Sequence, residues 1–131
     1  MTKEQKDLLL KDLSARLLYG VKLNMKGLIG VSHHTTILYG KNTEIYFRYA
    51  CNDYFIDEVK PYLFPLSSMT EEQKEEFNTK SLELQLKVID DEIMYEKATE
   101  FQVDFYNKHH LDWRGLIPMG LAIDATGLNI Y

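Results

Sequence analysis

Residues 21–60 limit the fold more than any other part of the chain, because they consist of short apolar runs separated by turn-forming residues. The runs are rich in β-branched and aromatic residues, which favour strands. Short strands joined by tight turns indicate a small antiparallel meander or a barrel-like sheet of four or five strands. The expected strands are residues 21–25, 28–32, 35–39, 44–49 and 54–56, and the expected turns are residues 26–27, 40–42 and 51–53.

A helix is expected before these strands. Thr2 and Gln5 have the spacing of a capping box, in which each side chain bonds the backbone amide of the other residue. Leucines then recur at three- and four-residue intervals, which predicts one apolar face as far as about residue 15. Tyr19-Gly20 should then turn the chain. The leucines are Leu9, Leu10, Leu13 and Leu17, and the residues expected to face solvent are Lys3, Lys6, Asp7, Lys11 and Asp12.

Two prolines mark the middle of the chain. Pro61 and Pro65 frame a segment that we expect to be irregular, because proline lacks an amide donor and disfavours helical geometry in the residue before it. This segment is the best candidate boundary between residues 1–60 and 61–131. We expect both halves to share one domain, since 131 residues that are 45% hydrophobic suffice for a single core.

The second half should contain two helices, one further strand and an apolar C-terminal tail. Thr70 is the expected cap of a short helix, with Gln73 three residues on. Strict alternation in residues 82–88 predicts a half-buried strand. A third helix, about residues 93–109, should bury Ala98, Phe101 and Phe105, and the tail at 116–123 should pack onto the domain. The expected fold class is therefore α+β.

Composition narrows the setting. No apolar run approaches the roughly 20 residues of a membrane span, and the first six residues are polar and unlike a signal peptide. Cys51 is the only cysteine, which excludes an internal disulfide and a thiolate-rich metal site. We therefore expect a cytoplasmic protein with no membrane partner.

The net charge of -5 is unevenly distributed. Residues 1–65 carry nine Lys/Arg and seven Asp/Glu, and residues 66–131 carry six and thirteen, so the halves are +2 and -7. Binding to a nucleic-acid backbone needs several basic residues on one face. The basic residues here are dispersed, and we expect no nucleic-acid partner.

Motifs for cofactors and metals are also lacking. Neither the Walker spacing nor G-x-G-x-x-G occurs in the sequence. The histidines form two adjacent pairs, His33-His34 and His109-His110, and neighbouring residues on a strand face opposite sides. His33 and His34 could not both bind one ion on an extended segment. We expect no cofactor and no metal site.

His110, Asp112 and Arg114 lie in a tight cluster at the end of the expected third helix. A histidine beside a carboxylate could be oriented for proton transfer, but the sequence places no nucleophile next to it. The structural alternative is a histidine at a helix C-terminus and an aspartate that caps a turn or pairs with Arg114. Both interpretations name the same three residues.

Aromatic residues suggest a second candidate site. Tyr46, Arg48 and Tyr49 lie in one expected strand, and tyrosine offers a flat apolar face with a polar tip to a partner or ligand. Strand alternation places Tyr46 on the face opposite Ile45 and Phe47. Core packing is the alternative role for these rings.

Three segments are similar to a known group of proteins. They are KDLSARLLYGV at residues 11–21, VKPYLFPLSSMTEE at 59–72 and HHLDWRGLI at 109–117. Together they resemble short uncharacterised proteins encoded by phages, prophages and genomes of Bacteroidales bacteria. This chain departs from that group at Leu18, where proline is usual, and at Phe64, where arginine is usual.

The resemblance implies a setting, the cytoplasm of a bacterial host cell, and no mechanism. Phage-borne accessory proteins of this size commonly act by binding, so the leading hypothesis is a non-enzymatic protein that binds a host or phage protein. The alternative is a small-ligand binder that sequesters a nucleotide signal through Arg114, Arg48 or Lys60. A hydrolase or transferase that uses His110 and Asp112 is the third hypothesis. The oligomeric state stays open.

Overall fold

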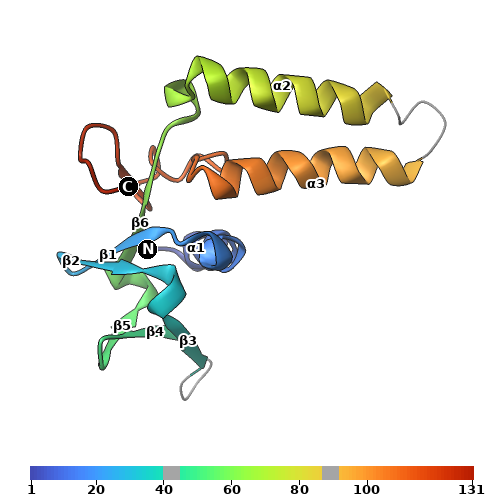
Figure 1. The fold of residues 1–131 in the computed structure, drawn as a ribbon. Helices are drawn as coiled ribbons and strands as arrows, with labels where there is room; N and C mark the ends of the chain where they lie inside the picture. The colour runs from blue at the N-terminus through green and yellow to red at the C-terminus, as the bar shows by residue number, and fades with distance from the viewer. Residues whose placement is uncertain (40–44, 87–91) are drawn as a thin grey trace.

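The computed structural model describes residues 1–39, 45–86 and 92–131 and confirms the α+β class (Figure 1). An N-terminal helix is followed by antiparallel strands, two further helices and a final strand, as expected. The elements are α1 (Lys3–Arg16), β1 (Lys22–Met25), β2 (Leu28–Val31), β3 (Thr36–Tyr39), β4 (Ile45–Tyr49), β5 (Asn52–Phe55), β6 (Val59–Leu63), α2 (Glu71–Leu86), α3 (Glu92–Lys108) and β7 (Ile123–Asp124).

Helix α1 begins with the expected capping box. The Thr2 hydroxyl accepts from the Gln5 amide at 3.1 Å, and the Gln5 side chain accepts from the Thr2 amide at 2.9 Å. Leu9 and Leu13 are buried, but so is Asp12, which we expected to face solvent. That expectation was wrong because Asp12 pairs with Arg16 one turn later, on the same face as the two leucines.

Within the described ranges the strands form two sheets, with orders β2-β1-β6-β7 and β3-β4-β5. The antiparallel strands expected between residues 21 and 56 are present, but the chain leaves the first sheet after β2 and makes a separate three-stranded meander. It then returns as β6, which pairs antiparallel with β1. Glu44 and the turn expected at 40–42 lie outside the described residues.

Strand β6 runs through Pro61, where we expected an irregular segment, so that expectation was wrong. Pro61 lies opposite Leu23. Because a two-residue turn follows Met25, Leu23 and Gly30 form a hydrogen-bonded pair, and the backbone groups of Leu23 point toward β2. They point away from β6, so Pro61, which lies opposite Leu23, needs no amide donor toward β1. On its other side β6 pairs with β7 only from Tyr62 onward. A proline is therefore tolerated inside this strand.

Helices α2 and α3 pack side by side as an antiparallel pair (Figure 1). Thr70 and Gln73 form the expected capping box of α2. The helix continues through residues 82–86, so the strand predicted at 82–88 is wrong as far as residue 86, and residues 87 and 88 lie outside the described part. Phe77 packs between Phe105 and Tyr106 of α3, with ring centroids 5.2 Å apart in each case.

The C-terminal tail packs onto the body as expected. Leu116, Leu121 and Ala122 are buried, and β7 adds to β6 in parallel. Of the residues expected inside α3, Phe105 is buried and Phe101 half-buried, while the side chain of Ala98 lies outside the described residues. The main core joins α1, both sheets and this tail through Leu9, Leu13, Val21, Leu23, Met25, Phe47, Val59, Leu63 and Leu116.

A search for membrane-spanning helices among residues 1–39, 45–86 and 92–131 found none of sufficient length and apolarity.

Candidate functional site

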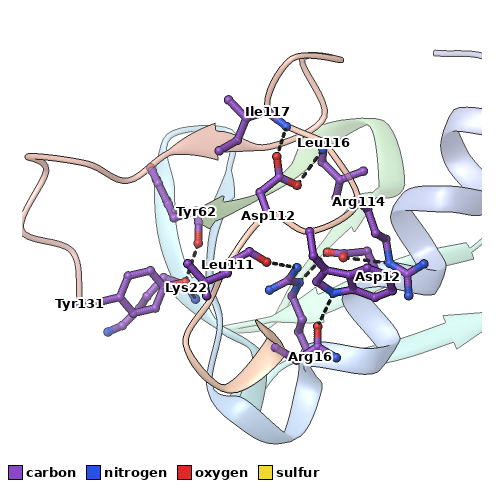
Figure 2. Close-up of polar contacts among 12 residues, drawn as sticks. Asp12, Arg16, Lys22, Tyr62, Leu111, Asp112, Arg114, Leu116, Ile117 and Tyr131 are labelled. Carbon is purple, nitrogen blue, oxygen red and sulfur yellow. Dashed lines mark hydrogen bonds and ion pairs between the residues drawn. The ribbon is translucent and has the colours of Figure 1, made fainter. Parts of the chain in front are cut away.

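The segment 109–117, which holds His110, Asp112 and Arg114, contacts two buried charges on α1, Asp12 and Arg16 (Figure 2). Arg16 is fully buried, and its Nε donates to Asp12 Oδ2 at 2.8 Å. Its Nη2 donates to the backbone carbonyl of Leu111 at 2.7 Å. A buried guanidinium is tolerated only with such partners, so α1 and the segment 109–117 depend on each other.

Asp112 is used inside its own loop. Its Oδ1 accepts from the Leu116 amide at 2.7 Å and its Oδ2 from the Ile117 amide at 2.9 Å (Figure 2). The Asp112 amide in turn donates to the carbonyl of Phe64, just beyond β6. With both oxygens bonded to backbone amides, this carboxylate caps a turn, which is the structural alternative considered above.

Arg114 packs against the same helix. Its guanidinium carbon lies 4.0 Å from the centre of the Trp113 ring, a cation–π distance. Its Nε lies 3.2 Å from Asp12 Oδ1, an ion pair without hydrogen-bond alignment. Trp113 is itself held by a hydrogen bond from Nε1 to Asn107 at the end of α3. Only 14% of the Arg114 side chain is exposed, which leaves little of it for a ligand.

His110 ends α3 in a left-handed conformation, with φ of 57°. The His110 amide bonds the carbonyl of Asn107 and the Leu111 amide bonds that of Tyr106, which is the Schellman arrangement. The imidazole stacks on Tyr131, with centroids 4.0 Å apart. Burial, and then the positive charge of Arg16, lowers the pKa of His110 to about 4, so the ring is neutral near pH 7.

Catalysis would need a nucleophile beside this neutral imidazole, and the described contacts supply none. Nδ1 of His110 is buried and makes no hydrogen bond to the described residues. Ser68 donates its hydroxyl to the carbonyl of Pro65, and Cys51 is exposed in the turn between β4 and β5. Among the described residues no group of three or more His, Cys, Asp or Glu is arranged to hold a metal ion. The segment 109–117 is therefore best understood as a structural latch.

Tyr46 and Arg48 lie on the other candidate site, the outer face of the β3-β4-β5 sheet. Register places Tyr46 beside Leu38 and Phe55, and Arg48 beside Thr36 and Asp53. Phe55 is 51% exposed, and Arg48 makes two hydrogen bonds to Asp53, at 2.8 and 3.3 Å. We define the outer face as Thr36, Leu38, Tyr46, Arg48, Asp53 and Phe55.

Tyr49 does not belong to the outer face. It shares the opposite side of β4 with Phe47, which is 1% exposed, and it packs against the main core. A Cβ added to Gly30 of β2 would meet the Tyr49 ring at 3.4 Å. Of the three aromatic-strand candidates, the structure thus groups Tyr46 and Arg48 and assigns Tyr49 to packing between the two sheets.

Two of the hollows among the described residues bear on a small-ligand site. One of about 480 Å³ lies where the first turns of α1 meet the ends of β4 and β5, and its lining includes Lys3, Lys6 and Phe55. Another of about 270 Å³ is lined by His109 and Gln73 among others. Neither is lined by Arg48, Lys60 or Arg114, the cations that we expected for a small-ligand site.

The sequence interpretation did not assign a role in this region to three residues: Asp12, Arg16 and Tyr131. The first two carried a usable signal, because opposite charges four residues apart fall within the leucine face of α1. Tyr131 carried none. Its hydroxyl accepts from the Lys22 amide at 2.8 Å and donates to the Tyr62 carbonyl at 2.7 Å, contacts that only the folded chain creates.

Comparison of the chain with protein-family models, with curated proteins and with solved structures found no match.

Proposed function

We propose that this chain is a non-enzymatic accessory protein, of the kind encoded by phages and mobile elements of Bacteroidales, that binds a protein partner through the outer face. The observation that carries the proposal is the division of β4. Its Phe47 side is buried in the core, whereas its Tyr46 and Arg48 side presents a partly exposed aromatic and a guanidinium beside Phe55. Tyrosine, phenylalanine and arginine are enriched at protein interfaces.

The polar cluster offers less support for the enzymatic hypothesis. Both oxygens of Asp112 are bonded to backbone amides, and Arg114 is held by Trp113 and Asp12. A general acid or base needs a free atom within reach of a substrate, and the unbonded Nδ1 of His110 is buried. These contacts favour the outer face as the surface for function.

The test is affinity purification of the tagged chain from Bacteroidales lysate followed by native mass spectrometry. We expect one host or phage protein to co-purify with the parent chain and to be lost with Arg48→Glu or Phe55→Glu. Leu82→Glu is the matched control, since Leu82 is 57% exposed on α2 and should leave binding unchanged.

Two outcomes would contradict the proposal. A partner retained by both outer-face variants would place binding elsewhere. An adduct of small mass on the parent chain, without a protein, would favour the alternative of ligand sequestration, for which the 480 Å³ hollow with Lys3 and Lys6 has an adequate size.

A further inference from the structure

Strand β2 forms one end of the four-stranded sheet. In Figure 1 it lies at the outer margin of the molecule, with β1 on its inner side. The contacts of β2 as an element are dominated by β1, its hairpin neighbour. One long side of β2 therefore faces away from the sheet.

The register shows which backbone groups point outward. The two-residue turn makes Met25 and Leu28 a hydrogen-bonded pair, and alternation then makes Leu23 and Gly30 the next one. The backbone groups of Ile29 and Val31 therefore point away from β1. The Val31 carbonyl accepts from the Thr35 hydroxyl at 3.0 Å. The donor and acceptor of Ile29 and the donor of Val31 remain for another strand.

This edge is short, at four residues, but it carries no charge, proline or bulge. Natural proteins protect free edges with charges, prolines or bulges. Residues 28–31 contain no charge and no proline, and their register with β1 is continuous. Leu28 is 44% exposed and Ile29 is 48% exposed, so apolar side chains flank the free backbone groups on both faces.

The edge is also held straight. Gly30 would ordinarily weaken a strand, but the Tyr49 ring and the Met25 sulfur cover it, each at 3.4 Å from the position of an added Cβ. The hairpin tip is neutralised, because Lys26 pairs with Glu58 at 2.8 Å. A preformed, uncharged edge is available without rearrangement.

We propose that β2 pairs antiparallel with β2 of a second copy of this chain, around a two-fold axis near Gly30. That axis places Ile29 opposite Val31 of the other copy, so that the free Val31 amide of each copy meets the free Ile29 carbonyl of the other and two apolar side chains are in contact. Because residues 28–31 carry no charge, no like charges face each other across the axis, despite the net charge of -5 on each chain. The two four-stranded sheets become one continuous sheet.

A second copy suits this edge, since an antiparallel pair around Gly30 brings the free donor of Val31 in each copy opposite the free acceptor of Ile29 in the other. The interface uses the first sheet, whereas the outer face belongs to the second. Dimerisation and partner binding can therefore fail independently in experiments.

The test is sedimentation velocity of the purified full chain from low to high micromolar concentration. We expect a species of twice the 15.4 kDa chain mass to grow with concentration and to be absent from Ile29→Lys over the same range. Leu18→Lys is the control. Leu18 is 86% exposed and lies outside the sheet, so this variant should dimerise like the parent.

Hydrogen exchange supplies a readout that needs no variant. The Val31 amide, which gains the Ile29 carbonyl of the other copy, should exchange more slowly in the dimer than at dilutions where the chain is monomeric. A chain that stays monomeric throughout, an Ile29→Lys variant that dimerises normally, or a dimer in which the Val31 amide exchanges as in the monomer would overturn the proposal.

Discussion

Two ion pairs of equal length show how burial changes the role of the same chemistry. Arg16 and Asp12 are 2.8 Å apart with both side chains fully buried, and Arg48 and Asp53 are 2.8 Å apart with about half of each exposed. Water screens the second pair, and it competes for the same hydrogen bonds. Arg16 and Asp12 have both lost their hydration on burial, and the attraction between them offsets much of that cost.

We therefore predict that Asp12→Ala lowers the free energy of unfolding by about 3–5 kcal/mol, since it leaves a buried guanidinium without its carboxylate. Asp53→Ala, the matched change at the exposed pair, should leave stability nearly unchanged. Urea unfolding followed by circular dichroism measures both variants. Equal losses for the two would show that burial of Asp12 is not what makes its pair important.

The buried imidazole of His110 predicts acid sensitivity. Its folded pKa, about 4, lies below the ordinary 6.5, so below pH 6.5 the unfolded chain gains a proton that the folded chain does not. The stabilising contribution is complete above pH 6.5 and is lost as the pH falls toward 4. Burial also lowers the pKa of His109, which adds to the effect in the same direction.

The measurement is the free energy of unfolding at several pH values between 4 and 7. His110→Asn should flatten the decline with falling pH, because asparagine tolerates the left-handed backbone and does not titrate. His34→Asn, at an exposed position, should keep the parent slope. A parent slope that survives in His110→Asn would assign the acid sensitivity to other groups.

At the scale of elements, β1 and β6 separate where Tyr131 enters. Their ladder ends with Leu23 opposite Pro61, and the next pair in register would be Lys22 and Tyr62. The Tyr131 hydroxyl instead bridges the Lys22 amide and the Tyr62 carbonyl. Burial of this hydroxyl raises the pKa of Tyr131, so it stays protonated and able to donate. Its ring meanwhile stacks on His110, which links the strands to the latch.

Removing this hydroxyl should cost about 1 kcal/mol, because Tyr131→Phe takes the partner from a donor and an acceptor that are only partly shielded from water. Thermal or urea unfolding gives the loss, and faster exchange of the Lys22 amide would locate it. Tyr46→Phe on the outer face is the control for the loss of a tyrosine hydroxyl. An unchanged exchange rate of the Lys22 amide in Tyr131→Phe would contradict this prediction. It would show that β1 and β6 pair directly at Lys22 and Tyr62 once the hydroxyl is absent.

The elements that the sequence predicted well are those stabilised by near neighbours. The capping boxes of α1 and α2 span three residues, and the turn at Lys26-Gly27 joins adjacent strands. The turn expected at 51–53 begins one residue earlier, because Asn52 and Asp53 already pair with β4. Errors arose where a distant partner decided the outcome. The alternation at 82–88 indicated a strand, but contacts with α3 select the helical face of Phe77 and Leu84.

At the scale of the whole molecule, the α+β class followed from the sequence but the division into two sheets did not. The partners of β1 and β6 lie far along the chain, at residues 59–61 and 123–124. No local pattern encodes such pairings. The same limit applies to the candidate site: His110, Asp112 and Arg114 share one segment, but the partners of that segment lie on α1, at the end of β6 and at Tyr131.

The bond from Arg16 to Leu111 joins residues 95 positions apart. On a ribosome, α1 emerges long before the carbonyl that its buried arginine requires, so a nascent chain cannot complete this contact until most of its length is synthesised. Chains dominated by such distant contacts close them slowly, since the entropy of a large loop is lost before the contact forms. Until then the leucine face of α1 lacks the tail residues that pack against it in the folded chain, and an apolar face exposed in this way favours aggregation.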